Sequence, residues 1–506
     1  MQKRAVIGGD IGTGSCKVVA FDFEGNIIGS RTMEYPLIHP RWGWAEQDPR
    51  LILNTFVRCL KELLGSLKDE NWGIELISLS SVFHSVLAVD HQNTPLTNCL
   101  PWADSRALAE VEFIKEQRLP HYFYQRTGCP PHPMYLPGKL LWWKKQMPDV
   151  FEKAHKFISI KEYILAELTG EYLVDFSVAS GSGLLNLHEL KWDNEVLELI
   201  GINTEKLSTL VSTQTVLPPI RPVWAREMGL DPGTPWVIGG GDGTCSNLGS
   251  GAVGQGIMTA MVGTSGAVRV MSPEPKIDPQ GRTWCYQMTD NMWVSGGAIN
   301  NGGIVYRWYR DKIMTDDMEL GSTGDYEVMN RWAQEIPPGS DGLLCLPFLA
   351  GERSPYWNAN ARGVLFGLGL EHTKKHVARA IMEGVVYRMY SVYKALAELN
   401  GKPVEIRASG GFARSPLWLS ILSDVFGCEV KVPDGVEGSA LGAAILGMAA
   451  LKIIPSVNVA EKMVTTSYQC TPDWENHRLY QEIYKVYEKT YWGLQESFAM
   501  LAKMKR

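Results

Sequence analysis

Two stretches of the chain place a single aspartate among glycines directly after an apolar, strand-like run. AVIGGDIGTGS at 5–15 contains Asp10, and VIGGGDGTC at 237–245 contains Asp242. Glycine lets backbone N–H groups approach a ligand, and successive N–H groups in such turns can bind an anion. A carboxylate there can hold a metal ion or accept a proton. From its neighbours alone, Asp242 is better explained as a turn residue or a helix N-cap.

The turn that follows Asp10 has a counterpart in the second half of the chain. Gly12-Thr13-Gly14-Ser15 and Gly263-Thr264-Ser265-Gly266 each join an apolar run to a β-rich run. Each alone is typical of a tight hairpin turn, but equivalent places in an internal repeat favour two phosphate-binding turns. Asp10 would then face a phosphate-bound Mg²⁺, directly or through water. Lys17 on the outgoing strand faces either the phosphates or the solvent.

The elements that position these residues are those of a mixed α/β protein. We expect strands within 5–28, 76–90, 404–409 and 428–432, and helices within 105–117, from 140 onward, and within 373–399, 415–426 and 438–451. Thr373 is a suitable N-cap, and Gly401 ends that helix. We place a boundary between two lobes near 250–256, which gives domains of 1–252 and 253–455, followed by a helical extension of 456–506.

Composition excludes several classes of protein. The chain of 506 residues carries 49 basic and 55 acidic residues, a net charge of −6, which argues against a nucleic-acid surface. Its nine cysteines include no C-x-x-C, so no zinc knuckle or disulfide framework is indicated, and a reducing compartment fits. No signal-peptide core follows the first residues, and the longest apolar run, 439–451, is too short to span a bilayer. We therefore expect a cytoplasmic protein with no membrane contact.

Some familiar motifs fail on inspection. Gly249, Gly251 and Gly254 match G-x-G-x-x-G but lack the βαβ context of a dinucleotide fold, and no P-loop motif occurs. His372 and His376 are spaced like a zinc pair, but without H-E-x-x-H they are better explained as residues at a helix start. The sequence predicts no separate metal-ligand cluster.

Taken together, the glycine motifs resemble those of the FGGY carbohydrate kinases, a branch of the actin-like ATPase superfamily, over nearly the whole chain. The C-terminal signature is met at every constrained position between Gly363 and Glu383, whereas Leu136 stands where the earlier signature usually has Pro, Ser or Thr. The resemblance implies an α/β fold of two actin-like (ribonuclease H-like) lobes with an ATP and sugar cleft between them. It also implies a nucleotide motif at 408–415, with Gly410, Gly411, Phe412 and Ala413 as binding residues.

Within this family, several stretches are similar to bacterial gluconate kinases, among them GWAEQDP at 43–49, WADSR at 102–106 and GERSP at 351–355. Xylulose kinases share some of them. The resemblance implies ATP-dependent phosphorylation, most of all of D-gluconate to 6-phospho-D-gluconate, with xylulose or another polyol as the alternative acceptor. An actin-like ATPase without a sugar acceptor is the alternative from another class. ATP, Mg²⁺ and a sugar or sugar acid are the expected ligands, and the chain is compatible with a homodimer.

The resemblance also assigns roles to individual side chains. Asp242 becomes the general base, because the family's base is the aspartate of such a glycine-rich stretch late in the first lobe. A lone histidine such as His84 usually has a structural role, but its position matches a sugar-contacting loop. Arg106 either binds substrate or is a structural partner of its neighbours. The substrate-binding residues expected on this basis are His84, Trp102, Asp104, Arg106, Gly241, Asp242 and Arg353.

Overall fold

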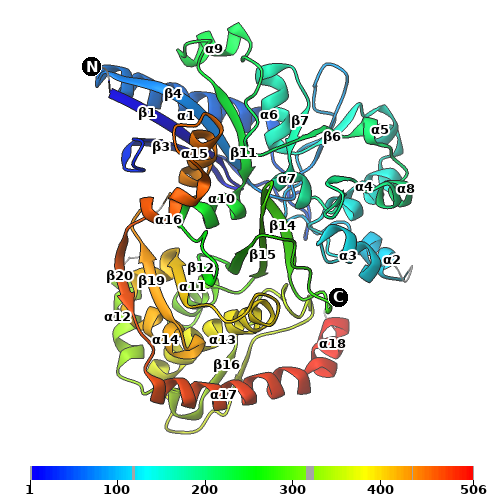
Figure 1. Ribbon diagram of the computed structural model, residues 1–506. Helices are drawn as coiled ribbons and strands as arrows, with labels where there is room; N and C mark the ends of the chain where they lie inside the picture. The colour runs from blue at the N-terminus through cyan, green and yellow to red at the C-terminus, as the bar shows by residue number, and fades with distance from the viewer. Residues whose placement is uncertain (1–2, 117–119, 315–323, 436, 505–506) are drawn as a thin grey trace. The chain divides into compact units, whose positions relative to one another are not determined.

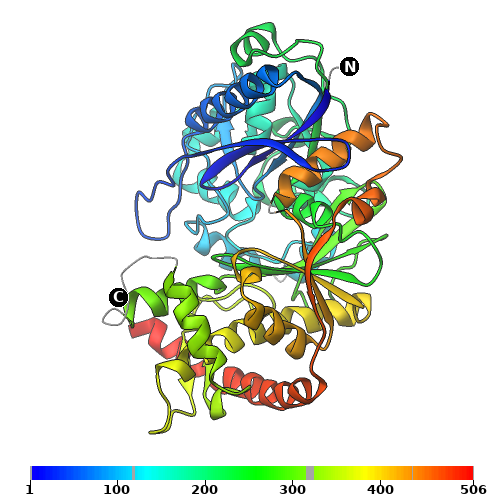
Figure 2. The same ribbon diagram turned by 90° about the vertical axis from the view of Figure 1, so that its left-hand side faces the viewer.

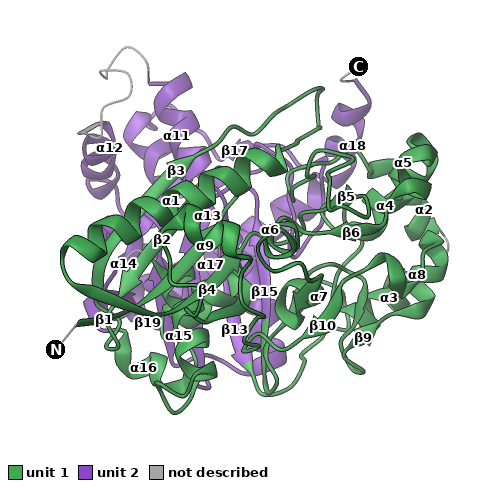
Figure 3. Ribbon diagram, turned by 90° about the horizontal axis from the view of Figure 1, so that it is seen from above, with its two compact units in different colours: residues 1–253, 272–294, 437–464 green, residues 254–271, 295–436, 465–506 purple. Residues whose placement is uncertain are grey.

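The computed structural model describes residues 3–116, 120–314, 324–435 and 437–504. Its contacts group the chain into two compact units, each assembled from separate segments (Figure 3). Unit 1 comprises Met1–Val253, Ser272–Val294 and Glu437–Val464, and unit 2 comprises Gly254–Met271, Ser295–Val436 and Thr465–Arg506. Unit 1 therefore contains segments from both halves of the sequence, whereas unit 2 lies wholly in the second half.

Unit 1 is built on a five-stranded sheet of order β11-β4-β1-β2-β3. The strands are β1 Lys3–Ile11, β2 Ser15–Phe21, β3 Ile27–Glu34, β4 Trp72–Ser81 and β11 Trp236–Gly241. β1 pairs antiparallel with β2 and parallel with β4, which in turn is parallel to β11. The carboxyl ends of the three parallel strands therefore meet at one edge of the sheet, which is where Asp10 and Asp242 stand.

Helices cover both faces of this sheet. α1 (Pro49–Asp69) begins at the N-cap Asp48 and packs its apolar side on one face (Figure 2), with Phe56 beside Gly9. α15 (Gly438–Ala450) packs on the other face, against β1, β4 and β11. A Cβ on Gly8 would lie 1.9 Å from the carbonyl oxygen of Ala440. Glycine at this position is therefore what lets α15 approach the sheet so closely.

The remaining elements of unit 1 are short and carry the loops around the sheet edge (Figure 1). The strands are β5 Leu87–Val89, β6 Lys156–Ile158, β7 Leu173–Asp175, β8 Leu185–Asn186, β9 Lys191–Trp192, β10 Thr209–Val211 and β14 Trp284–Thr289. The helices are α2 Leu108–Glu116, α3 Pro120–Thr127, α4 Leu136–Gln146, α5 Pro148–Lys153, α6 Ile160–Thr169, α7 Phe176–Ser180, α8 Asn194–Ile200, α9 Pro222–Met228, α10 Asp242–Gly249 and α16 Ala460–Met463.

Unit 2 repeats the strand order of unit 1. Its strands belong to a seven-stranded sheet of order β14-β15-β13-β12-β18-β19-β20, in which β15-β13-β12-β18-β19 correspond to β3-β2-β1-β4-β11. The hairpin β12–β13 is antiparallel, and β12, β18 and β19 are parallel. The strands are β12 Ile257–Val262, β13 Gly266–Ser272, β15 Met292–Ile299, β18 Glu405–Ser409, β19 Glu429–Pro433 and β20 Thr466–Cys470. The shared order and pairing confirm the internal repeat expected from the two glycine turns.

Helices and one small hairpin complete unit 2 around a single large apolar core. α13 starts after Thr373 and ends before Gly401, whose φ is 82°, as the capping residues predicted. The helices are α11 Gly303–Lys312, α12 Gly324–Gln334, α13 Lys374–Asn400, α14 Pro416–Phe426, α17 Trp474–Gly493 and α18 Gln495–Met504, and the hairpin is β16 Leu344–Leu346 with β17 Val364–Phe366.

Two features differ from the organisation expected from the sequence. Residues 437–464 pack with unit 1. Gly438 and Gly442 of α15 lie close to the backbone of α10, and Gly8 of β1 lies close to the backbone of α15. The C-terminal extension is not wholly helical, because β20 pairs antiparallel with β19. The predicted domain limits of 1–252, 253–455 and 456–506 are limits in sequence and remain a prediction.

Candidate active site

The first glycine turn, which joins β1 to β2, is held by several hydrogen bonds. The Gly12 N–H donates to the Ser15 carbonyl at 2.9 Å, and the Tyr35 hydroxyl donates to the Gly12 carbonyl at 2.6 Å. The Trp102 indole N–H donates to the Thr13 hydroxyl at 2.9 Å, and the Gln47 side-chain amide donates to the Thr13 carbonyl at 2.6 Å. The turn is therefore preorganised, and Trp102 contacts it directly.

Asp10 lies at the end of β1, next to this turn. The Ser80 hydroxyl on β4 donates to Asp10 Oδ1 at 3.1 Å, and Lys17 is its register partner on β2. Burial, followed by the negative charge of Asp242, raises the pKa of the Asp10 carboxyl to about 7. The two aspartates that the sequence singled out, 232 positions apart, are thus electrostatically coupled at one sheet edge.

Asp242 is the first residue of α10, directly after the buried strand β11. Its Oδ1 accepts a hydrogen bond of 2.7 Å from the N–H of Gly243, but the N-cap is Gly241 and no side chain caps the helix, so Asp242 stands at the helix start without being its N-cap. That geometry also projects a carboxylate from the sheet edge beside Asp10. Gly241 cannot carry a side chain here, because a Cβ would lie 2.1 Å from the Phe83 ring.

Buried polar groups of α6, β7 and α7 anchor the end of β11. Lys161 donates to the Asp175 carboxylate at 2.8 Å and to the Gly240 carbonyl at 3.2 Å, and both side chains are almost fully buried. The Ser177 hydroxyl accepts from the Gly241 N–H at 3.1 Å. These contacts fix the backbone that leads into Asp242.

Lys17 does not face open solvent. Its ammonium pairs with both carboxylate oxygens of Glu437, each at 2.9 Å, at the start of α15. The positive charge of Lys17 lowers the pKa of Asp10, and the negative charge of Glu437 raises it. The ion pair therefore sets part of the field at Asp10 and ties the α15 segment to β2.

His84 lies in the loop after β4 with a left-handed backbone, φ 63°. Its Nδ1 is 2.6 Å from the Gly181 carbonyl oxygen, and since a carbonyl only accepts, Nδ1 carries the proton. The imidazole lies among the rings of Phe83, Tyr135 and Tyr286, with centroids 4.9–5.8 Å away. In the neutral ring Nε2 is then the hydrogen-bond acceptor, which suits a sugar hydroxyl as donor.

Asp104 and Arg106 form a buried structural pair, which differs from the sugar contact expected for Asp104. The Arg106 Nε donates to both Asp104 oxygens at 2.9 Å, and Ala45 N–H donates to Asp104 Oδ2 at 2.8 Å. Arg106 also pairs with Glu46 at 2.7 Å and stacks on Trp44 at 4.0 Å. Their side chains are 0% and 3% exposed. Of the two interpretations of Arg106, the structure favours the structural partner.

The second glycine turn, in unit 2, is also closed by an internal backbone hydrogen bond, which spans one residue fewer than that of the first. The Gly263 N–H donates to the Ser265 carbonyl at 2.9 Å, and Gly266 begins β13. The start of α11 closes over it, because the Gly303 N–H donates to the Gly263 carbonyl at 2.8 Å and Ile304 N–H to the Thr264 carbonyl at 3.2 Å. Thr264 remains exposed at the tip of the turn.

The predicted nucleotide motif follows β18 in unit 2. Gly410 has φ 96°, and a Cβ there would lie 2.4 Å from the Val262 carbonyl oxygen, so only glycine suits this turn. Gly410 and Gly411 are exposed, and Ala413 is partly exposed. Phe412 differs, because its ring is buried against Trp418 in the core of unit 2. The Phe412 ring therefore packs in the core beside the motif, and this side chain is not accessible to a nucleotide.

Arg353 sits in a buried network of unit 2. Its Nη2 donates to the Ile299 carbonyl at 3.2 Å. The neighbouring Glu352 accepts from the N–H of Asn300 at 2.7 Å and pairs with the fully buried Arg388 at 3.0 Å. This network orders the loop before α11 that closes the second glycine turn.

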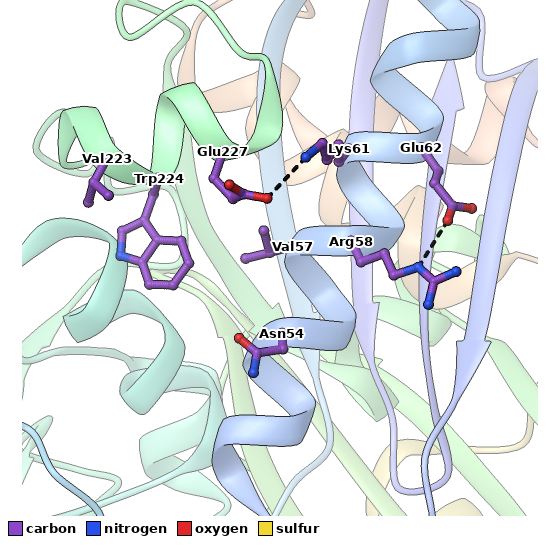
Figure 4. A pocket seen from close by; sticks show the side chains of 8 residues that line it. All are labelled: Asn54, Val57, Arg58, Lys61, Glu62, Val223, Trp224 and Glu227. Atoms are coloured by element: carbon purple, nitrogen blue, oxygen red, sulfur yellow. Dashed lines mark hydrogen bonds and ion pairs between the residues drawn. The ribbon is translucent and has the colours of Figure 1, made fainter.

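A hollow between α1 and α9 lies away from these motifs (Figure 4). Its two cations are already paired, Lys61 with Glu227 at 3.0 Å and Arg58 with Glu62 at 3.1 Å. None of the predicted site residues lines it; the lining residues are Asn54, Val57, Arg58, Lys61, Glu62, Val223, Trp224 and Glu227. We assign it no role in the chemistry.

Sequence reasoning did not identify Ser80, Tyr35, Gln47 or Glu437 as site residues. Gln47 lies in the GWAEQDP stretch, which was a signal that could have found it. Glu437 had no local signal, because its partner Lys17 is 420 positions away.

Among the residues that the structure describes, no group of three or more His, Cys, Asp or Glu side chains could hold a metal ion. His376 lies in the first turn of α13, and His372 directly precedes its N-cap Thr373. No helix in the described ranges is long and apolar enough to cross a membrane.

The chain is similar to known proteins over nearly its whole length. Residues 5–249 match the N-terminal domain of the FGGY family of carbohydrate kinases, and residues 258–451 match its C-terminal domain. The chain is 41% identical to a gluconokinase of Bacillus subtilis, over 99% of this chain and 98% of that protein.

Two crystal structures from Lactobacillus acidophilus are similar throughout. A xylulose kinase matches with a TM-score of 0.94 and 33% identity, over 98% of this chain and 100% of that one. A gluconate kinase matches with a TM-score of 0.93 and 33% identity, over 98% and 99%. The two-unit α/β architecture expected from the resemblance is confirmed. The protein belongs to the FGGY family of carbohydrate kinases.

Proposed function

We propose that the protein transfers the γ-phosphoryl group of ATP to D-gluconate, giving 6-phospho-D-gluconate and ADP. The observation that carries the choice of substrate is the 41% identity to the Bacillus gluconokinase over 99% of the chain. The similar xylulose kinase and gluconate kinase structures are each 33% identical, so these two structures do not discriminate between the substrates. Xylulose is therefore the alternative acceptor that the experiment must include.

The proposed chemistry centres on the coupled carboxylates of unit 1. As the terminal hydroxyl oxygen of the sugar acid bonds to the γ-phosphorus, its proton moves to Asp242. The bond from the γ-phosphorus to the β–γ bridging oxygen breaks, and ADP leaves. Phosphoryl transfer depends mainly on positioning and charge stabilisation, so Asp242 both orients the hydroxyl and accepts its proton. The anchored end of β11 and the start of α10 supply that orientation.

Asp10 is the residue proposed to hold Mg²⁺. Mg²⁺ is usually bound by one or two carboxylates together with phosphate oxygens and waters, so a lone aspartate beside a phosphate turn fits it. Burial and the charge of Asp242 make the ionised Asp10 unfavourable, a state that a bound cation would stabilise. When bound, Mg²⁺ would supply positive charge against the phosphate oxygens.

The remaining site residues divide between nucleotide and sugar. We assign the phosphates to the turns at 12–15 and 263–266, and the nucleoside to Gly410, Gly411 and Ala413, which are accessible in the structure. Lys17 acts through its pair with Glu437. His84, Trp102 and Gly241 remain the sugar candidates of unit 1, and Arg353 remains the candidate of unit 2.

A coupled ADP-release assay with gluconate, xylulose, ribulose and glycerol tests the proposal. We expect the highest kcat/KM with gluconate. A higher kcat/KM with xylulose would replace gluconate by the alternative acceptor. ADP release that does not depend on any sugar would instead indicate an actin-like ATPase without an acceptor.

We also expect ATP and the sugar acid to be the principal small-molecule partners, without nucleic-acid binding, in a cytoplasmic enzyme. The net charge of −6 supports the expectation about nucleic acid. Sedimentation velocity of the purified protein tests whether it is a homodimer.

A further inference from the structure

Lys139 is a fully buried lysine for which the proposed reaction provides no direct role. It lies on α4, and its side chain has no exposed surface. Its Nζ donates to three backbone carbonyl oxygens, those of His84 at 2.7 Å, Pro101 at 2.8 Å and Leu100 at 3.3 Å. An ammonium has three donors and no acceptor, so these carbonyls match its protonated form.

The three carbonyls belong to two loops that carry the sugar candidates of unit 1. His84 follows β4, whereas Leu100 and Pro101 come directly before Trp102. Trp102 in turn donates to the Thr13 hydroxyl of the first glycine turn at 2.9 Å. One buried ammonium thus connects the histidine loop, the tryptophan loop and, through Trp102, the phosphate turn.

The backbone of His84 needs such a restraint. Its φ of 63° is in the left-handed region, which is unfavourable for a residue with a side chain. The His84 ring is fixed by the Gly181 carbonyl at 2.6 Å, and the His84 carbonyl is fixed by Lys139. Two independent contacts therefore define where the imidazole points.

The surrounding charges are compatible with a charged Lys139. Burial lowers the pKa of its ammonium to about 7, the carboxylate of Asp104 and the thiol of Cys99 oppose this effect, and the Arg106 guanidinium adds to it. The loop carbonyls contribute negative partial charge directly at Nζ. An uncharged amine would have only two N–H donors and would turn its lone pair toward a carbonyl oxygen.

We propose that Lys139 is a positioning residue that holds His84 and Trp102 in the arrangement that binds the sugar acid. This inference rests on the proposed function, because it takes these two residues as sugar contacts. Lys139 does not touch substrate. It acts directly on the two sugar loops and only indirectly, through Trp102, on the phosphate turn, so its loss should weaken sugar binding far more than nucleotide binding.

The test compares Lys139→Met with Lys144→Met. Lys144 lies on the same helix and donates to the Ile200 carbonyl at 3.0 Å, away from both sugar loops, so it is a matched control. We expect the KM for gluconate to rise about tenfold to a hundredfold in Lys139→Met, the range typical of a misplaced binding group. The ADP Kd measured by calorimetry should change far less than this KM, and Lys144→Met should change neither value.

Lys139→Gln provides the second variant, because its amide keeps two donors in a smaller side chain. We expect a KM between those of wild type and Lys139→Met, and this variant decides the matter if Lys139→Met does not fold. An unchanged KM in a folded variant, or equal losses of gluconate and ADP binding, would overturn the proposal. A wild type that phosphorylates another sugar of the panel would refute gluconate as substrate, and the KM comparison then proceeds with that sugar.

Discussion

Replacing Asp10 by Asn should make the metal-free protein more stable relative to wild type as the pH rises. The pKa of Asp10 is raised from 3.8 to about 7, first by burial and then by the charge of Asp242. An acid with a raised folded-state pKa contributes stability below its unfolded pKa of about 4 and loses that contribution as the pH rises through 7. Asparagine does not titrate, so the variant avoids this loss.

The size of the effect follows from the two pKa values. A shift from 3.8 to about 7 corresponds to roughly 4 kcal/mol over the whole range. Roughly 2.5 kcal/mol of this change in the free energy of unfolding develops between about pH 5 and 8, the range that can be measured. Asp10 is partly exposed, so solvent screening makes these figures upper values.

Urea unfolding in EDTA at several pH values between about 5 and 8 measures this difference. The free energy of unfolding of Asp10→Asn, relative to wild type, should rise with pH and level off above about 7. Asp242→Asn should lower the pKa of Asp10 and so shrink the rise, because it removes the second largest cause.

Asp90→Asn is a suitable control. The Asp90 carboxylate accepts from the Thr94 and Gln92 N–H groups, and the Thr94 N–H is the main cause that lowers its pKa. Asp90 therefore titrates below this pH range, and the free energy of unfolding of Asp90→Asn should differ from that of wild type by a constant amount. If the free energy of unfolding of Asp10→Asn also differed from that of wild type by a constant amount over this pH range, the reasoning about burial and Asp242 would be wrong.

Three further substitutions test other parts of the structure. Asp242→Asn should reduce kcat about 10²- to 10⁴-fold, as expected for loss of a general base, with an unchanged ADP Kd by calorimetry. Arg106→Lys should lose about 2 kcal/mol of stability in urea unfolding, because lysine cannot reproduce the paired contacts with Asp104. Gly8→Ala should lose about 3 kcal/mol in the same assay, because its Cβ would lie 1.9 Å from the Ala440 carbonyl oxygen.

Each of these has a contrary outcome. Near-normal turnover of Asp242→Asn would remove that residue from the proposed mechanism. A stable Arg106→Lys with a greatly raised KM for gluconate would make Arg106 a substrate ligand instead of a structural partner. Gly14→Ala is the stability control for Gly8→Ala, because a Cβ on Gly14 meets no atom within 4 Å, and equal losses in both would contradict the close packing of α15.

Local patterns in the sequence predicted those elements whose determinants are close together in the chain. The helix from Lys374 to Asn400 begins and ends at the capping residues that the sequence indicated, and the glycine turn at 12–15 joins two antiparallel strands. The repeated glycine turns also indicated that the second half repeats the first, because strand, turn and strand are set within about fifteen residues.

Contacts between distant residues could not be predicted in this way. Asp104 was expected to meet the sugar, but the structure buries it against Arg106 and Ala45, and nothing in W-x-D-x-R reveals that burial. α15 was assigned to the second lobe, but small residues on its surface pack against Gly8 and α10 of unit 1. Burial depends on which surfaces meet, and local periodicity does not specify that.

By itself the sequence determined the two glycine turns, the aspartates beside them and the positions of several strands along the chain, because each depends on local backbone preferences and on hydrophobic pattern. Only the tertiary structure decided that Asp10 and Asp242 interact, that Lys17 pairs with Glu437 and that Lys139 joins two loops. The first arises because parallel strands bring their carboxyl ends to one edge, where electrostatic coupling depends on the separation and burial of the groups. The other two arise because the α15 segment and α4 pack beside parts of the chain that are distant in sequence.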